Sequence, residues 1–443
     1  MTLQPEIMKS VEQLGYRVTV GDVAAQAGLN VNLAQQGLLA LASDAAGHLQ
    51  VAESGEIVYL FPQDFRTILR NKYWKLRLKE TWDKIWKVLF YLIRISFGII
   101  LIASIILMVI AIAVIIIGIN SSKEGNDRDS SGSRGGGFGG GGIFFLPNFS
   151  NLFLIFSPDY RYQRYGYSSS SRSQTSKPSS DLNFLEAIFS FLFGDGDPNY
   201  NLEERRWQAI GTVIRNNKGS IVAEQVAPYL DNINQSNRET EDYILPVLTR
   251  FNGTPEVSPE GEIIYYFPEL QVTVQEQTQK SLASYLREKL YRFSEASSSQ
   301  IMLGIGLGAL NFILALVLGS FLKSPELVAQ FGGFIAFINS IYWVLLGYAI
   351  AFLGVPLIRY FWVQGKNSKI EDRNKQRQER NKLLEEKDKT LKQKLAYARQ
   401  FATQKLITES DITYTTEKDV IEQEIEQSDR IDQEWQRRLD SEQ

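Results

Sequence analysis

One eight-residue stretch occurs twice in this chain and sets its organisation. Residues 55–62 (GEIVYLFP) return as residues 261–268 (GEIIYYFP), with six identical positions and hydrophobic residues at the other two. Each copy closes a short module of ordinary polar content, and each is followed by a basic leader and then by a long apolar run. The sequence therefore predicts one unit, a soluble module followed by a membrane-spanning helix, used twice.

Three apolar runs are long enough to cross a membrane. Residues 95–119 carry no charged side chain, residues 301–321 are interrupted by Asn311, and residues 331–360 form the third run. About twenty helical residues cross the roughly 30 Å hydrocarbon core of a bilayer. The first residues are polar and mixed in charge, which is not typical of a cleaved signal peptide. We therefore expect an integral membrane protein, mainly α-helical.

Both modules show the element order of a winged helix. Residues 1–66 predict a strand, two helices and a hairpin, at 18–20, 22–27, 33–42, 48–52 and 56–61. Residues 201–270 fit the same plan, with helices at 207–215, 222–230 and 243–251 and a wing at 255–257 and 262–267. We expect two small α+β modules of this kind.

Charge opposes a nucleic-acid role for these modules. Residues 1–66 hold three basic and seven acidic side chains, and residues 201–270 hold six basic and eleven acidic ones. The segment at the recognition-helix position, residues 30–42, has no Lys or Arg. Affinity for DNA depends largely on neutralising phosphates with those residues. The modules are therefore expected to dock proteins.

The residues available for chemistry are few. The chain has no cysteine and one histidine, His48. This excludes disulfides, thiolate metal sites, cysteine-ligated iron–sulfur clusters and any Ser-His-Asp triad without His48. His48 stands at the entry of a predicted strand, which favours a structural role. We predict no catalytic, cofactor-binding or metal-binding residue, and a protein that is not an enzyme.

The leaders combine basic and aromatic residues. In residues 67–94 we expect a membrane-interface set: Arg70, Lys72, Trp74, Lys75, Arg77, Trp82 and Trp86. Such a set serves as an anchor and topology signal, or alternatively recognises specific membrane lipids. Residues 275–299 repeat the pattern more weakly, as an amphipathic leader with an apolar stripe of Leu282, Leu286, Leu290 and Phe293.

The charges also predict an orientation. Basic residues before the first and second spans and after the last place both modules and the tail in the cytoplasm. Three crossings cannot return the chain to its starting side, so a fourth, imperfect one is expected between the first span and the second module. The Gly/Ser-rich linker 121–181, with a re-entrant or interfacial segment at 143–156, and a short apolar helix at 182–194 are the candidates.

Inside the second span we expect close helix packing at Gly304 and Gly308, with Asn311 as a polar contact. A transport path is the alternative, but no span carries a central Asp or Glu. The tail, residues 364–440, is predicted to be a long charged helix that is broken at residues 411–416. Its narrow apolar stripe suggests packing against a partner or a second copy, and a homo-oligomer through tail and spans.

Several motifs together resemble a known family. They are Phe193–Asn199 (FGDGDPN), Glu204, Trp207, Tyr243–Leu248 (YILPVL) and Val355–Arg359 (VPLIR). The chain is similar in these motifs, and over nearly its whole length, to membrane proteins of cyanobacteria and the chloroplast envelope that are often labelled iron–sulfur cluster biosynthesis proteins. The resemblance implies a cyanobacterial plasma or thylakoid membrane and supplies no catalytic residues.

These observations favour a non-enzymatic scaffold or assembly factor that docks cytoplasmic or stromal-side proteins at a membrane. A channel or transporter is one alternative, because the spans are rich in glycine. An accessory role in iron–sulfur cluster maturation, exerted through partners, is the other.

Overall fold

The computed structural model describes residues 4–72, 74–123, 182–231, 233, 240–275, 279–324, 328, 332–386, 388–425, 428, 432 and 435–436. The chain forms two compact units. We call the first the module unit (Met1–Trp82, Pro198–Leu290 and Ser368–Gln443) and the second the helical unit (Asp83–Asp197 and Tyr291–Asn367). The predicted linker 121–181, with its segment 143–156, lies outside the described residues from 124 onwards.

The first module alternates helices with a small antiparallel sheet. Its elements are α1 (Pro5–Gln13), β1 (Arg17–Thr19), α2 (Val20–Ala27), α3 (Val31–Asp44), β2 (His48–Ala52), β3 (Ile57–Leu60) and α4 (Phe65–Lys72). Thr19 and Asp22 form a capping box at the start of α2, and the Asn30 side chain caps α3. Strand β3 pairs with both β1 and β2.

The second module repeats this order with shorter elements. They are α8 (Leu202–Asn216), β4 (Ser220–Ile221), α9 (Ala223–Val226), η1 (Ala227–Tyr229), η2 (Asp242–Ile244), α11 (Leu245–Phe251), β5 (Thr254–Val257) and β6 (Ile263–Tyr266). The helix expected at 222–230 is shorter, because Pro228 cannot donate the next helical hydrogen bond and the chain tightens into a 3₁₀ turn. Strand β6 lies between β4 and β5.

The repeated sequence gives a repeated geometry. Gly55 and Gly261 both take positive φ angles, 86° and 88°, in the hairpin turns. The phenylalanine that follows each hairpin is buried, and its backbone N–H donates to a carbonyl just before the first strand. These bonds are Phe61 to Tyr16 at 2.9 Å and Phe267 to Gly219 at 2.8 Å.

The two modules share one hydrophobic core. Helix α2 packs against α8 closely enough that a Cβ on Gly211 would lie 2.9 Å from the Cα of Ala25. At the edge of this contact Arg215 donates to the buried carboxylate of Asp22 at 2.6 Å. The modules therefore form one folded body.

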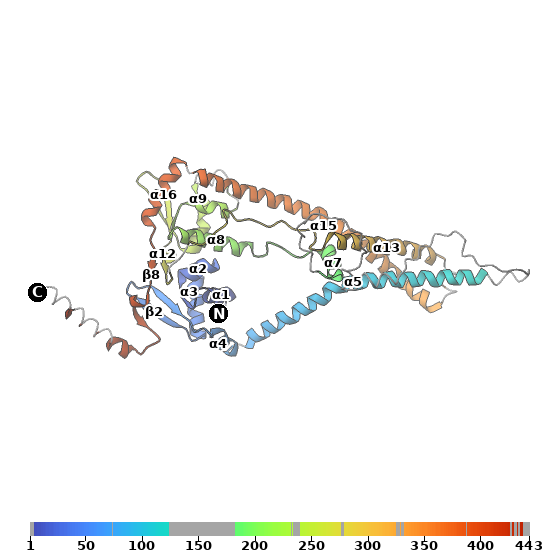
Figure 1. Ribbon diagram of the computed structural model, residues 1–443, viewed down its shortest axis with the longest axis horizontal. Helices are drawn as coiled ribbons and strands as arrows, with labels where there is room; N and C mark the ends of the chain where they lie inside the picture. The colour runs from blue at the N-terminus through green and yellow to red at the C-terminus, as the bar shows by residue number, and fades with distance from the viewer. Residues whose placement is uncertain are drawn as a thin grey trace, which may run out of the picture. The chain divides into compact units, whose positions relative to one another are not determined.

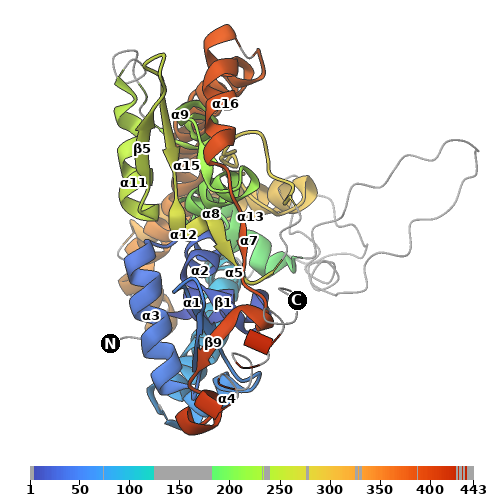
Figure 2. The same ribbon diagram turned by 90° about the vertical axis from the view of Figure 1, so that its left-hand side faces the viewer.

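The C-terminal tail also belongs to that body. It continues as α16 (Lys389–Phe401), β8 (Lys405–Leu406), η3 (Glu409–Asp411) and β9 (Ile412–Thr415). The apolar stripe of α16 packs on Val222 and Ile264 of the second module. Strand β8 pairs in parallel with β7 (Val272–Thr273), which follows α12 (Pro268–Gln271), and β9 pairs with β2. Figure 2 shows this path from α16 down to β9.

Two strands interrupt the predicted helical tail 364–440. Strand β9 lies at the break expected at residues 411–416, whereas β8 lies in a part expected to be helical. The strands form because β7 and β2 leave unpaired edges in the same chain and because the Ile-Thr-Tyr-Thr sequence of β9 favours extended backbone. The expected partner for the apolar stripe of α16 lies within the same molecule.

The helical unit contains apolar helices of different lengths (Figure 1). They are α5 (Trp74–Lys123), which begins in the module unit, α7 (Phe184–Phe193), α13 (Ser298–Leu322) and α15 (Gly332–Glu386), which ends in the module unit. Among the described residues three helices are long and apolar enough to cross a membrane, within Thr81–Asn120, Ser298–Leu322 and Gly333–Glu386. The short apolar helix expected at 182–194 is α7, which packs against α5 and α13.

The leaders differ from each other. Residues of the first, 67–94, lie in α4 and in α5, which continues into the apolar run without a break from Trp74. The second, 275–299, is not a helix over the described residues 279–297. Asparagine side chains hold it extended by bonding both backbone groups of one residue, as Asn374 does for Glu288 and Asn367 for Tyr291.

Candidate functional site

The predicted membrane-interface residues are partly engaged in the fold. Lys72 forms an ion pair with Asp44 of the first module at 2.8 Å, and Arg70 lies beside it on α4. Trp82 and Trp86 on α5 are exposed. The side chains of Trp74, Lys75 and Arg77 lie outside the part of the chain that the structure describes.

The predicted packing residues lie on the buried face of α13. A Cβ on Gly308 would lie 2.5 Å from the ring of Phe352 on α15, so this helix pair needs glycine there. Asn311 is fully buried and accepts a 2.7 Å hydrogen bond from Ser104 on α5. Gly304 lies nearer α7, where a Cβ would be 3.9 Å from Phe191.

A polar junction around Asp195 was not predicted as a site. Its carboxylate accepts hydrogen bonds from Arg94 on α5 at 3.1 Å and from Ser190 on α7 at 2.6 Å. It also accepts from the backbone N–H of Glu295, just before α13, at 2.8 Å. Arg359 on α15 donates to the last carbonyls of α7, including that of Phe191 at 2.8 Å. The junction thus links α5, α7, α15 and the segment before α13 through hydrogen bonds.

The sequence did contain a signal for this junction. Arg94 and Arg359 stand at the ends of apolar runs, where a charge needs a partner. Asp195 belongs to the FGDGDPN motif that carries the family resemblance. Asn199 of the same motif bonds both backbone groups of Lys289, at 2.7 and 2.8 Å, so the motif is structural on the evidence of its contacts.

In the module unit an ion-pair network ties α15 to the second module. Arg377 is fully buried and contacts Asp231 at 2.6 Å and Glu288 at 2.8 Å. Arg373 pairs with the same Glu288 carboxylate. Burial alone would raise the pKa of Glu288, but the hydrogen bonds and charges of Arg373 and Arg377 outweigh it and hold the pKa below its ordinary value.

A second network fixes α16. Lys394 contacts Glu241 at 2.6 Å, Glu224 at 3.0 Å and Glu262 at 3.4 Å. Burial would lower the pKa of Lys394, but the surrounding carboxylates raise it above its ordinary value. The hydroxyl of Tyr265, in the second copy of the repeat, donates to Glu241 at 2.8 Å. The lysine therefore stays charged and acts as a structural bridge.

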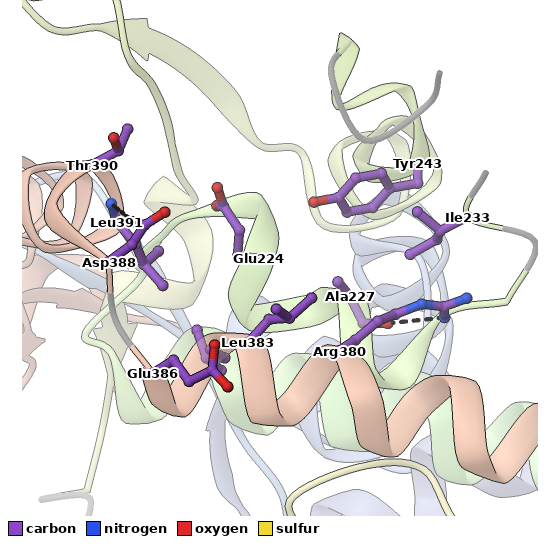
Figure 3. Close-up of a pocket in the computed structure, with 11 residues that line it drawn as sticks. Glu224, Ala227, Ile233, Tyr243, Arg380, Leu383, Glu386, Asp388, Thr390 and Leu391 are labelled. Atoms are coloured by element: carbon purple, nitrogen blue, oxygen red, sulfur yellow. Dashed lines mark hydrogen bonds between the residues drawn. The ribbon is translucent and has the colours of Figure 1, made fainter. Parts of the chain in front are cut away.

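Beside this network lies a cavity of about 300 Å³. Figure 3 shows Asp388 and Thr390 on one side, Tyr243 and Arg380 on the other, and Glu224 between them. Arg380 donates to backbone carbonyls of the second module. The cavity is acidic overall because three carboxylates line it, from Glu224, Glu386 and Asp388, against this one basic side chain. Within the described ranges no group of three or more His, Asp or Glu could hold a metal ion.

His48 lies at the start of β2, opposite Leu60 of β3. It is far along the chain from the groups of both networks.

The most distinctive surface lies on α3 and α11. Leu33 and Leu39 of α3 are 47% and 44% exposed, and Leu245 of α11 is 55% exposed. The two helices meet where Asn30, the cap of α3, donates to the carbonyl of Thr249 at 3.0 Å. Figure 2 shows them end to end on one side of the module unit. We call the exposed residues of these helices the neutral face: Asn32, Leu33, Gln35, Gln36, Leu39, Ser43, Leu245, Pro246 and Thr249.

The neutral face is unusual in its charge. From Val23 to Ser43 the chain has no charged residue, although charged residues make up 22% of the whole sequence. Centres of protein–protein interfaces are depleted of charge in the same way. A surface of this composition can bury its leucines against a partner without burying an unpaired charged side chain.

Comparison with known proteins shows that the chain is similar in sequence to a plant protein. No family model matches it, and no solved structure matches it. It is similar to a protein of Arabidopsis thaliana named "Uncharacterized protein At5g03900, chloroplastic". The two are 38% identical over 445 aligned residues, which cover 98% of this chain and 81% of the relative.

Proposed function

The chain belongs to the family of the chloroplastic Arabidopsis thaliana protein At5g03900, and we propose that it is a membrane-anchored, non-enzymatic scaffold that docks proteins on its module unit. The modules and tail face the cytoplasm or stroma in this proposal. The observation that carries it is the neutral face, whose exposed residues on α3 and α11 carry no charge and include Leu33, Leu39 and Leu245.

The element order of the modules supports the proposal. Both have helical segments, a short strand and a hairpin in the order expected of a winged helix, and in that interpretation α3 and α11 take the position of the recognition helix. In nucleic-acid readers that helix carries basic and polar groups. Here α3 has no Lys or Arg, and the one arginine of α11, Arg250, donates to the carbonyl of Gly28. The proposed occupant is therefore a protein with an equally uncharged, leucine-accepting surface.

The membrane part of the proposal rests on the helical unit. Three helices among the described residues are apolar enough to cross a membrane. At their ends Arg94 pairs with Asp195, and Arg359 donates to backbone carbonyls of α7. Polar contacts among its described residues include the Ser104–Asn311 pair and the hydrogen bond from the Tyr348 hydroxyl to the carbonyl of Phe97. Such a bundle suits an anchor, because its described interior is packed with apolar side chains.

Site-specific photo-cross-linking in the native host tests the docking role. A photoreactive amino acid replaces Leu39 on the neutral face or, as the matched control, Glu260, which is exposed at the tip of the second hairpin. We expect a discrete protein adduct from position 39 and none from position 260. Leu39→Glu should abolish capture of that protein without lowering the thermal stability, because the side chain is exposed.

The proposal fails if positions 33, 39 and 245 all give no adduct above the control. It also fails if mild-detergent purification recovers the bait alone from both wild type and Leu39→Glu.

A further inference from the structure

The last strand of the chain, β9, extends the sheet of the first module beyond what that module needs. In the second module the equivalent sheet consists of β4, β6 and β5 and closes without a fourth described strand. In the first module β9 is added outside β2, with a register irregularity between Val51 and Ala52. Comparison of the two copies therefore identifies β9 as an addition to a complete wing.

The segment that contains β9 has one fully buried apolar side chain, Ile407. We call residues 405–416 the latch. Ile407 is 2% exposed and fills a small apolar pocket made by Ala52, Val58 and Val272. Both residues of β8 are exposed, as is Tyr414 of β9. By contrast α16, which precedes the latch, buries a longer apolar stripe and is fixed by the Lys394 network.

The other latch contacts include packing of Ile412 against the same pocket and an ion pair between Lys405 and Glu56 at 2.8 Å. Several more are backbone hydrogen bonds of the kind that any extended segment makes. The N–H of Ile407 donates to the carbonyl of Thr273 at 2.8 Å. Thr416 donates its N–H to the carbonyl of Leu49 at 2.9 Å, and the N–H of Glu53 donates to the carbonyl of Asp411 at 2.8 Å. Removing the latch would leave an open strand edge next to an apolar pocket, which is how strand-addition sites are built.

The charges around the pocket add a preference. Arg17 donates to the carbonyl of Ile407 at 3.0 Å, and the carboxylates of Glu409 and Asp411 interact with its positive charge. A segment that suits this site therefore carries a branched aliphatic anchor followed within a few residues by acidic side chains.

We propose that the β2 edge and the pocket of Ala52, Val58 and Val272 form a peptide-acceptor groove, occupied in this state by the latch. Its partner is an extended protein segment with a branched aliphatic anchor and acidic residues after it. The latch blocks the groove until such a segment displaces it. This inference deepens the docking role proposed above, because it supplies a second docking site and the element that regulates it.

The test uses the purified full-length chain in detergent and a fluorescent synthetic peptide of residues 403–417. Replacing Ile407 by Ser removes the anchor of the latch, so the groove becomes available to the added peptide. We expect the peptide to bind Ile407→Ser on the order of 30-fold more tightly than wild type, from the free energy of burying one aliphatic side chain. Ile407→Val should give about a 5-fold gain, and the exposed control Leu406→Ser none.

Hydrogen–deuterium exchange on the same proteins keeps the test independent of peptide affinity. Amides of the latch should exchange faster than those of β3 in wild type, and faster still in Ile407→Ser, while α16 is unchanged. Equal peptide binding by all four proteins overturns the proposal, as does latch exchange as slow as that of β3. Neither result touches cross-linking at Leu39, so failure of the latch is distinguishable from failure of the docking role.

Discussion

Asp22 offers the sharpest test of the shared core of the two modules. Its side chain is 3% exposed, accepts from Arg215 of the second module at 2.6 Å and closes the capping box with Thr19. Thr273 donates to the same carboxylate at 3.0 Å. One carboxylate therefore joins three segments.

Asp22→Ala should destabilise the module unit by about 4 kcal/mol. Leaving a buried charge without its partner costs about 3–5 kcal/mol, and loss of a helix cap costs about 1 kcal/mol, with the two effects overlapping. The Arg215 side chain is only 8% exposed, so water cannot replace the carboxylate. For a body of this size the loss corresponds to a fall in Tm of about 10 °C.

Thermal unfolding of the full-length chain in detergent, followed by intrinsic fluorescence at a fixed scan rate, measures this change. The double variant Asp22→Ala/Arg215→Met should recover much of the loss, because it removes both charges together. Glu260→Ala, on an exposed turn, is the control. Two results would refute a buried ion pair between the modules. One is a decrease in Tm of less than about 2 °C for Asp22→Ala, and the other is a double variant whose loss of stability equals the sum of the losses of the two single variants.

Three further outcomes follow from contacts in the two units. The pKa of Glu288 is lowered in the fold. The carboxylate therefore stabilises the fold fully above its ordinary pKa of 4.5, and this stabilisation is lost as the pH falls through the lowered pKa. Glu288→Gln should remove this acid dependence of stability, as measured by denaturant titration at several pH values. Gly308→Val should lower the Tm of the helical unit by forcing α13 from α15, whereas Gly306→Val, with open space around it, should not. Asp195→Ala should destabilise by about 3 kcal/mol or more through loss of Arg94, and Asp195→Asn by less, as scored by thermal unfolding.

Much of the module fold could be predicted because its signals are local. Gly55 and Gly261 mark the hairpin turns, and Asn30 marks the start of α3. The length of the apolar runs alone predicted long helices, and three such helices lie among the described residues. These features depend on a few neighbouring residues, and the repeat supplied each signal twice.

The rest depends on contacts between distant residues. Strand β9 forms because the edge of β2 is available, and residues 49 and 416 are too far apart in sequence for periodicity to pair them. The second leader was expected to resemble the first, yet the side chains of Asn367 and Asn374 hold its described residues 279–297 extended. The role of Asp195 likewise depends on the fold, which brings Arg94 and the residues before α13 beside its carboxylate.

The central claim of this account is that both copies of the repeat form one docking body on one face of a membrane. Because the chain has no cysteine, single cysteines at Ser54 and Glu260, each exposed at a hairpin tip, can be labelled with a membrane-impermeant maleimide in sealed vesicles of one orientation. The account predicts that both tips are labelled, or both protected, with equal labelling after permeabilisation. Labelling of one tip and protection of the other would contradict it.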